Sequence, residues 1–411
     1  MPFTLDEARA LDAADPLRAF RDRFDLPQGV LYLDGNSLGA LPKATRARLK
    51  TAVDEEWGQG LIRSWNSHDW IGAPARVGGK IAGLVGAKPG EVIVADSTSV
   101  NLFKLIAAAL RARPGRKVIL TEPGNFPTDL YVAQGVAELM GDVEIRLAPA
   151  SAIAEAVDEQ VALVMLTHVH YKSGARHDMA ALTHRAQEAG ALALWDLSHS
   201  AGALEVDLNG VNADLAVGCG YKYLNGGPGA PAFLFVAERH QAVLRSPLTG
   251  WMGHADPFEF VDNYRAVDGI GRFLCGTPSV LAMLALEVGV DLVAEAGMPA
   301  LAAKSVQLCT AFISAAETAC DGMGLTLVTS RDPAIRGSQV SFTHPEAYAV
   351  MQALIERGVI GDFRAPDILR FGFTPLYVGF EDVWRAADTL REVLSSGAWR
   401  AERFRERTRV T

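Results

Sequence analysis

Between residues 91 and 236, short runs of apolar and β-branched residues alternate with stretches in which apolar residues recur at helical spacing. The short runs predict strands and the periodic stretches predict helices. Strands are predicted at 92–95, 117–121, 143–148, 161–166, 192–197 and 232–236, with helices at 100–113 and in the segment that ends at Ala189. This alternation is typical of an α/β architecture, in which helices cover a mostly parallel sheet.

The flanking regions follow a different pattern, which predicts a smaller α+β domain. Thr4 and Glu7 have the spacing of a capping box and open a predicted helix towards Ala14, and a second helix is predicted at 40–53. Helix-compatible sequence at 280–316 precedes predicted strands at 325–329, 339–343 and 369–373. We therefore expect a large domain of residues 60–280 and a smaller domain that combines residues 1–59 with 281–411.

Three tryptophans, Trp57, Trp65 and Trp70, lie close together after the second predicted helix. Glycine and polar residues, among them Asn66 and His68, separate them, so we expect a loop-like segment with much aromatic surface. Such a segment could line a pocket, or it could simply anchor an N-terminal arm.

Composition narrows the class of protein. The chain has 411 residues, a net charge of −9 and 39 scattered Lys and Arg residues, so it has no basic stripe for nucleic-acid phosphates. No apolar run approaches the roughly 18 residues of a membrane-spanning helix. The 4 cysteines include no Cys-x-x-Cys pair, and acidic residues occupy the place of a basic secretion signal. We expect a cytoplasmic enzyme that binds neither nucleic acid nor membrane.

Candidate chemistry lies where polar residues follow predicted strands, because ligands bind beyond the carboxyl ends of the strands in open α/β sheets. Thr98 and Ser99 follow one strand and open a helix, whose N-terminal N–H groups bind phosphate well. The same residues could instead be plain helix caps. Asp196 ends another buried strand, where a carboxylate needs a cation or a set of hydrogen-bond donors.

A third candidate is Lys222, which stands between Tyr221 and Tyr223 and precedes a glycine-rich turn. A lysine partly desolvated among aromatic rings becomes nucleophilic, whereas the alternative is a surface lysine beside a turn. A phosphate site, an aspartate and such a lysine together form the set that pyridoxal 5′-phosphate requires. The lysine forms a Schiff base, the aspartate keeps the pyridine nitrogen protonated, and the helix end holds the phosphate. The glycines that flank the lysine are Gly218, Gly220, Gly226, Gly227 and Gly229.

Six segments carry a resemblance to a known family. They are residues 32–39 (YLDGNSLG), 126–129 (FPTD), 195–202 (WDLSHSAG), 220–229 (GYKYLNGGPG), 250–254 (GWMGH) and 370–377 (RFGFTPLY). In these segments the chain resembles the kynureninases, which are fold-type I pyridoxal-phosphate enzymes, and the resemblance extends from about Leu31 to about Trp384. It implies a large domain with a mostly parallel seven-stranded sheet between helices, plus the smaller α+β domain.

The resemblance also implies an activity, a hydrolase reaction at a carbon–carbon bond of a ketone. L-Kynurenine would be cleaved to anthranilate and L-alanine in tryptophan catabolism, or 3-hydroxykynurenine to 3-hydroxyanthranilate and L-alanine. Some kynureninases carry asparagine where this chain has Thr277, so the preference between the two substrates stays open.

Site residues follow from the same resemblance. Lys222 would form the Schiff base, Asp196 would pair with the pyridinium nitrogen, and Phe126 would stack on the cofactor ring. Arg370 would bind the substrate α-carboxylate with its bidentate fork, and Tyr221 is the candidate general acid near the substrate carbonyl. The other expected cofactor contacts are Thr98, Ser99, Pro127, Thr128, Asp129, Thr167, His199 and Tyr221, joined by Trp251 and Thr277 from the second subunit of a homodimer. Asn36 and His68 are further candidates for contact with the substrate.

Alternative functions and ligands agree less well with the sequence. His168 and His170 have a spacing compatible with a metal, but no zinc-ligand pattern accompanies them, so no metal is predicted. The runner-up function is that of another fold-type I enzyme, such as a cysteine desulfurase or an aminotransferase. A desulfurase needs a nucleophilic cysteine on a mobile loop, whereas Cys309 lies in a helical pattern. A non-enzymatic scaffold would be expected to lack Lys222 or Asp196, and both are present.

Overall fold

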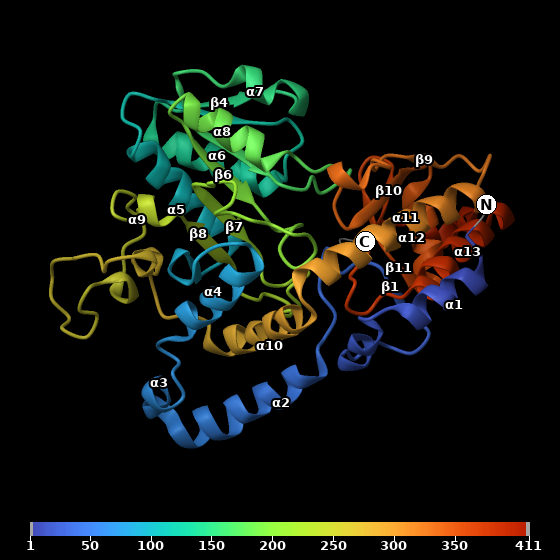
Figure 1. Ribbon diagram of the computed structural model, residues 1–411, viewed down its shortest axis with the longest axis horizontal. Coiled ribbons are helices and arrows are strands. Elements are labelled where there is room, and N and C mark those ends of the chain that lie inside the picture. Colours follow the sequence, from blue (N-terminus) through green and yellow to red (C-terminus); the bar gives the residue numbers. More distant parts are fainter. Residues whose placement is uncertain (1–2, 408–411) are drawn as a thin grey trace.

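The computed structural model describes residues 3–407, so Met1, Pro2 and residues 408–411 of the predicted smaller domain lie outside the described residues. Its larger lobe contains a seven-stranded sheet with the order β2-β8-β7-β6-β5-β3-β4 (Figure 1). The strands are β2 (Val92–Val94), β3 (Val118–Thr121), β4 (Glu144–Leu147), β5 (Val161–Thr167), β6 (Leu192–Asp196), β7 (Leu215–Gly218) and β8 (Phe233–Val236). Only β8 runs antiparallel to its neighbours in this sheet, which confirms the predicted mostly parallel arrangement.

Helices cover both faces of this sheet, because its central strands are buried apolar runs. On one face α5 (Thr98–Arg111) packs against α6 (Pro127–Met140) and the sheet. On the other face lie α4 (Ala73–Leu84), α8 (Met179–Glu188) and the short α7 (Ile153–Ala156). The short α9 (Glu238–Gln241) follows β8. The carboxyl ends of β5, β6 and β7 therefore meet at one edge, where the predicted site residues begin.

The smaller lobe is built on an antiparallel sheet with the order β12-β13-β10-β9. Its strands are β9 (Thr326–Leu327), β10 (Gln339–Thr343), β12 (Asp362–Arg364) and β13 (Ile368–Gly372), and its helices are α11 (Met298–Ala319), α12 (Ala347–Glu356) and α13 (Phe380–Ser396). The N-terminal α1 (Leu5–Ala14) packs on α13, and β1 (Leu31–Tyr32) pairs in parallel with β11 (Val359–Ile360). Both ends of the chain therefore lie in this lobe (Figure 1).

Two of the predicted segments differ from the structure. The helical run at 280–316 is two helices, α10 (Val280–Ala296) and α11, because Gly297 adopts a φ of +80° between them. The segment after the second predicted helix is also helical: α2 (Lys43–Thr51) continues as a π-helix, Ala52–Gly60, and leads to the short α3 (Ser64–Ser67). The expected loop around Trp57 and Trp65 was therefore wrong.

Side-chain hydrogen bonds hold the segment after α2 in its helical conformation. The Glu56 carboxylate accepts hydrogen bonds from Arg48 at 2.7 Å and from the Trp70 indole N–H at 2.8 Å. Trp70 is buried, whereas Trp57 remains 56% exposed. Trp70 thus anchors the segment, and α2 packs against α10, which in turn packs on α4 of the larger lobe. The boundaries at residues 60 and 280 stay a prediction.

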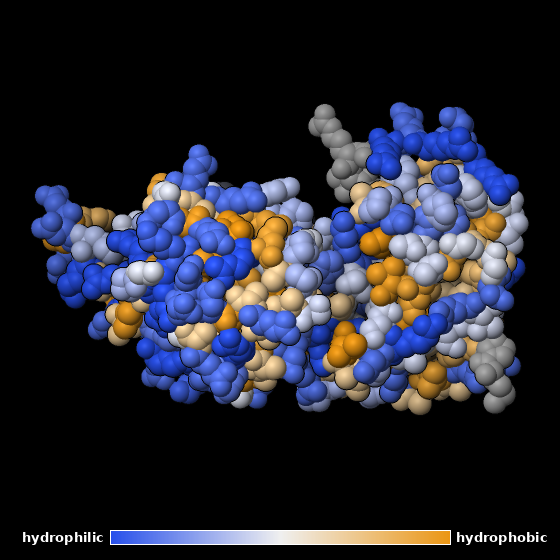
Figure 2. All heavy atoms as spheres, turned by 90° about the horizontal axis from the view of Figure 1, so that it is seen from above, coloured by the Kyte–Doolittle hydropathy of each residue, from blue (hydrophilic) through white to orange (hydrophobic). Residues whose placement is uncertain are grey.

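Within residues 3–407, the structure contains no helix that combines the length and the apolar character needed to cross a bilayer. Seen from above, apolar residues interrupt the hydrophilic surface over both lobes, and the outline of the molecule dips between them (Figure 2).

Candidate functional site

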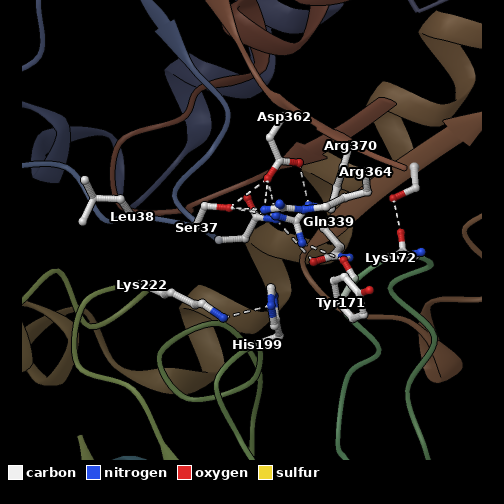
Figure 3. Close-up of polar contacts among 12 residues, drawn as sticks. Ser37, Leu38, Tyr171, Lys172, His199, Lys222, Gln339, Asp362, Arg364 and Arg370 are labelled. Atoms are coloured by element: carbon white, nitrogen blue, oxygen red, sulfur yellow. Dashed lines mark hydrogen bonds and ion pairs between the residues drawn. The ribbon is translucent and has the colours of Figure 1, made fainter. Parts of the chain in front are cut away.

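Lys222 lies in the loop that follows β7, and its side chain is buried. Its Nζ atom lies 3.0 Å from Nε2 of His199 and 5.7 Å from the centre of the Phe126 ring (Figure 3). The loop turns tightly: a Cβ atom on Gly220 would lie 2.4 Å from the carbonyl oxygen of Pro231. The glycine-rich sequence therefore allows a close backbone approach that places the lysine between the two lobes.

Asp196 ends β6 directly beside this loop and is also buried. Its Oδ1 atom accepts a hydrogen bond of 2.7 Å from the backbone N–H of Ser198. Burial raises the pKa of Asp196, while the charge of Lys222 opposes the rise. The donor and the cation that the sequence required for this carboxylate are both present.

Two buried polar atoms close to Lys222 have no hydrogen-bond partner, Asp129 Oδ1 and His199 Nδ1, and a third, Thr98 Oγ1, lies beside the hollow that Tyr221 also lines. Unsatisfied buried atoms are costly, so their grouping indicates a polar ligand. Burial and the charge of Asp196 raise the pKa of Asp129 well above its usual value. Burial and the charge of Lys222 lower the pKa of His199, so its imidazole is neutral. These residues fit a cofactor that carries both a polar ring and a phosphate.

At the expected phosphate-binding end of the site, the structure shows which residue caps the helix. Ser97, not Thr98 or Ser99, is the N-cap of α5, and its side chain accepts the N–H of Val100 at 3.3 Å. The hydroxyl of Thr98 is therefore not used in capping, and it lines a hollow of about 420 Å³ together with Tyr221. Ser99 lines a different hollow with Val100, which leaves its backbone N–H as the group at the helix end.

Phe126 is the N-cap of α6, and Pro127, Thr128 and Asp129 form the first turn of this helix. The Phe126 ring packs edge-on against Tyr171, with 5.2 Å between the ring centres. Thr167, at the end of β5, donates its hydroxyl to Asn125, and Oδ2 of Asp129 lies 3.4 Å from the same hydroxyl.

Asn125 is a site residue that the sequence analysis missed. Its Oδ1 atom accepts the N–H of Phe126 at 2.7 Å as well as the Thr167 hydroxyl, and its Nδ2 donates to Thr121 at 3.1 Å. The signal was present, because Asn125 directly precedes the FPTD motif, but nothing in the sequence alone indicated its partners.

Arg370 lies on β13 and is almost completely buried. Its Nε donates to Asp362 at 2.7 Å, its Nη2 donates to Asp362 and to Ser37, and its Nη1 donates to the carbonyl oxygen of Tyr171 at 2.6 Å (Figure 3). Four of its five N–H groups therefore have protein partners. Asp362 occupies the edge of the fork formed by Nε and Nη2, and the role of Arg370 in binding the substrate α-carboxylate stays a prediction.

Further residues surround Arg370 that the sequence analysis did not select. Arg364 donates to Asp362 and to Ser37, and the Asp34 carboxyl lies next to Asp362. Asp362 and Arg364 are charged residues in a short strand, and Asp34 and Ser37 belong to the YLDGNSLG motif. Asn36, the residue of that motif expected to contact the substrate, is buried and donates to Gln339 at 3.4 Å.

The N-terminal segment also supports the lysine loop. The backbone N–H of Gly39 donates to the carbonyl oxygen of Tyr221 at 2.7 Å. A Cβ atom on Gly39 would lie 2.3 Å from the carbonyl oxygen of Lys222. Residues 31–39 therefore contact both lobes, through β1 at one end and the lysine loop at the other.

Three predicted residues lie apart from Lys222 within the described chain. The exposed His68 has its ring nitrogen beside the hydroxyls of Ser64 and Ser67, on its own segment. Trp251 packs against Phe258, with 5.8 Å between the ring centres, and Thr277 is exposed.

The two histidines considered for a metal have different partners. His168 contacts the hydroxyl of Ser200, and His170 contacts the carbonyl oxygen of Gly124. Among residues 3–407, no group of three or more His, Cys, Asp or Glu side chains could hold a metal ion.

Comparison with known proteins places this site in a family. Residues 301–390 match the kynureninase C-terminal domain. The chain is 53% identical over 414 residues to kynureninase of Burkholderia pseudomallei strain 1106a, which covers 99% of this chain and 100% of that protein. It is 50% identical over 414 residues to kynureninase of Pseudomonas fluorescens, with the same coverage.

Solved structures agree on the fold. Cysteine desulfurase from Thermococcus onnurineus NA1 aligns with a TM-score of 0.78 and 20% identity, covering 92% of this chain and 98% of that one. An identity this low supports the fold-type I architecture and not a desulfurase function. The near-complete match to curated kynureninases, together with the buried lysine and aspartate, leads to one conclusion: this chain belongs to the kynureninase family of pyridoxal-phosphate-dependent hydrolases.

Proposed function

We propose that this chain hydrolyses L-kynurenine to anthranilate and L-alanine, with pyridoxal 5′-phosphate linked to Lys222. The observation that carries the proposal is the grouping of Lys222 and Asp196 with two unpartnered buried polar atoms, in a chain 53% identical to a kynureninase. A desulfurase would need a reactive thiol on a mobile loop; Cys219, Cys309 and Cys320 are unsuited to that role because they are buried and burial raises their pKa, which leaves the half-buried Cys275 as the one thiol to test. All four cysteines are free thiols, as expected in a reducing compartment, and we therefore propose that the protein acts in the cytoplasm.

The residues around Lys222 would hold the cofactor as follows. Asp196 would pair with the ring nitrogen, Phe126 would cover one face of the ring, and Thr98 with the first N–H groups of α5 would bind the phosphate. Asp129 and His199 would direct their unpartnered atoms to its remaining polar groups. When bound, the cofactor stabilises negative charge on the carbon atoms next to the substrate amine.

Proton transfer would fall to Lys222 and Tyr221. The freed amine of Lys222 would remove the α-proton, while the neutral His199 ring 3.0 Å away holds Nζ in place. Burial raises the pKa of Tyr221, which keeps its hydroxyl protonated and able to donate. We propose that this hydroxyl is the general acid near the substrate carbonyl. Tyr221→Phe tests that role, and unchanged carbon–carbon cleavage in the variant would exclude it.

Substrate binding would use the smaller lobe. The remaining Nη1 hydrogen of Arg370 would donate to the α-carboxylate, and Arg364, which shares Ser37 and Asp362 with Arg370, adds a second positive charge. An α-carboxylate placed there would leave the rest of an aromatic amino acid between the two lobes. Asn36, whose Oδ1 has no partner, lies at the same place.

We further propose a homodimer in which Trp251 and Thr277 of one subunit complete the site of the other. The loop after Trp251 supports this arrangement, because Phe258 is 63% exposed and Phe260 is 78% exposed. Isolated proteins seldom leave such side chains grouped in water. An apolar hollow of about 390 Å³, lined by Leu26, Leu41 and Pro228, offers a surface for a second copy.

The test is turnover by the purified protein. The proposal expects yellow protein, cofactor fixed to Lys222 by borohydride, and release of anthranilate with one alanine from L-kynurenine; a parallel assay with 3-hydroxykynurenine gives the substrate preference. Lys222→Ala should abolish release, whereas Lys117→Ala, an exposed lysine, should not. Cofactor-loaded protein that releases no aromatic acid but converts cysteine to alanine, with the sulfur retained as a cysteine persulfide on the protein, would favour the desulfurase alternative.

A further inference from the structure

Two arginines and two carboxyl groups are packed together where the substrate carboxylate is expected. Asp362 bonds to Arg370 and to Arg364, and both arginines donate to Ser37. Figure 3 shows the side chains of Ser37, Asp362, Arg364 and Arg370 together, on the side of the site opposite Lys222 and His199. Asp34, from the turn after β1, forms a β-bridge with Gly372, two residues after Arg370, and its carboxyl group interacts with Asp362 as the second carboxyl group.

The two carboxyl groups differ in their ability to hold a proton. Burial opposes ionisation of Asp362, but Arg370 and Arg364 outweigh it and lower the pKa of Asp362 below its usual value. Burial and the adjacent charge of Asp362 raise the pKa of Asp34 to about 7. One oxygen of Asp34 is buried without a hydrogen-bond partner. Two carboxyl groups this close retain one proton between them more easily than none.

This proton decides the charge of the cluster. With both carboxyl groups ionised, the two arginines are neutralised and an incoming carboxylate meets no net attraction. With one proton on the pair, the cluster carries one net positive charge, which matches the single negative charge of an α-carboxylate. We propose that Asp34 and Asp362 share one proton whenever a substrate carboxylate is bound, so that Asp34 is a positioning residue that couples substrate binding to proton uptake. This inference rests on the proposed function.

Other titratable groups that face the pair keep one charge state near neutral pH. Burial raises the pKa of Tyr32 and Tyr377, which stay neutral, and burial lowers the pKa of His199, which also stays neutral. Tyr171 contributes its backbone carbonyl to Arg370. Lys222, which would carry the cofactor, contacts His199 rather than the pair.

The experiment compares two ligands of the holoenzyme that differ only in charge, 4-phenylbutanoate and 4-phenylbutanamide. Both lack the amine, so neither reacts with the cofactor. Calorimetry between about pH 6 and pH 8.5 should show the dissociation constant of the acid rising by up to about tenfold per pH unit above the pKa of Asp34. Titrations in two buffers of different ionisation enthalpy should show proton uptake with the acid and none with the amide.

A variant of Asp34 and a control variant test whether Asp34 takes part in holding the shared proton. Asp34→Asn imitates the protonated pair in shape and charge, so it should remove both the pH dependence and the proton uptake. Asp22→Asn, at an exposed position of the same lobe, should retain them. In turnover, Asp34→Asn should change the pH profile of KM more than that of kcat.

Two results would overturn the inference: acid binding by the wild type that is independent of pH, or undiminished proton uptake in Asp34→Asn. If the variant does not fold, the wild-type comparison of acid and amide decides by itself. The calorimetric measurements need no turnover, so a failure to cleave kynurenine would count against the proposed function and not against the shared proton.

Discussion

The Nζ atom of Lys222 lies 3.0 Å from Nε2 of His199, and this histidine is buried with a lowered pKa. A neutral ring can hold the lysine amine without adding a second positive charge. Replacing the ring should therefore disturb the lysine more than the fold around it.

His199→Phe removes the only recorded hydrogen-bond contact of Nζ among the described residues. We expect kcat to fall by roughly 10²-fold, because a misplaced Lys222 amine loses much of its advantage as the proton-transfer group. His199→Gln, which keeps a polar partner, should lose less. Steady-state kinetics with L-kynurenine check this, with the exposed His184→Gln as the control. Equal losses in the Phe and Gln variants would show that hydrogen bonding at this position does not matter.

Asp129 gives a prediction for the dependence of stability on pH. The raised pKa means that folded Asp129 keeps its proton at pH values where the unfolded chain has lost it. The free energy of unfolding therefore falls as pH rises above about 3.9, the usual aspartate value. Asp129→Asn removes this contribution, so its gain in Tm over the wild type should grow between about pH 5 and pH 8. Thermal unfolding of cofactor-free protein measures the gain.

The control for that measurement is Asp142→Asn, because Asp142 is exposed on the surface beside Lys117. Its effect on Tm should not grow with pH. A gain for Asp129→Asn that is the same at both pH values would contradict the raised pKa.

Asn125→Ala should weaken both the fold and the cofactor site. The substitution leaves the Phe126 N–H and the Thr167 hydroxyl without their common acceptor. We expect a loss of about 1–3 kcal/mol in the free energy of unfolding, the usual cost of an unsatisfied buried group. Denaturant titration gives this value, and cofactor dissociation followed by absorbance should be faster. Unaltered cofactor retention would mean that Asn125 does not position Phe126.

The proposed shared site predicts that two inactive variants restore one another. Lys222→Ala and Trp251→Ala homodimers, unfolded together and refolded, should regain up to roughly a quarter of wild-type activity, because half of the dimers are mixed and each mixed dimer has one intact site. Each variant refolded alone provides the baseline. Activity that stays at the baseline would place Trp251 in the site of its own subunit, or in none.

The strands of the larger lobe could be predicted because each is a short apolar run between turn residues. Helix boundaries were harder: the apolar pattern continues across Gly297, and only its φ of +80° separates α10 from α11. Trp57 looked like part of a loop because glycines surround it, whereas Glu56 holds the segment in a π-helix through contacts with Arg48 and Trp70.

Some site residues could likewise be predicted from the sequence, and others could not. Asp196 and Lys222 follow strands of one sheet, so their meeting could be expected from topology. Ser37 and Asp362 are 325 positions apart and meet only through the packing of β1 and β12 near β13. No local pattern contains that information, which is why the occupied fork of Arg370 and the second carboxyl group, Asp34, could not be anticipated.

The contact of residues 31–39 with both lobes has a consequence for biosynthesis. This segment leaves the ribosome early, yet its partners β11 and β12 are among the last strands to be made. A nascent chain released after β8 would already contain Phe126, Asp196, Lys222 and Tyr221, the partner of Gly39, but β1 would lack its partner β11 and Arg370 would not yet exist. Because Arg370 lies in β13, recognition of the substrate carboxylate at this position requires nearly the whole chain to be synthesised, and a chain that terminates after β8 lacks it.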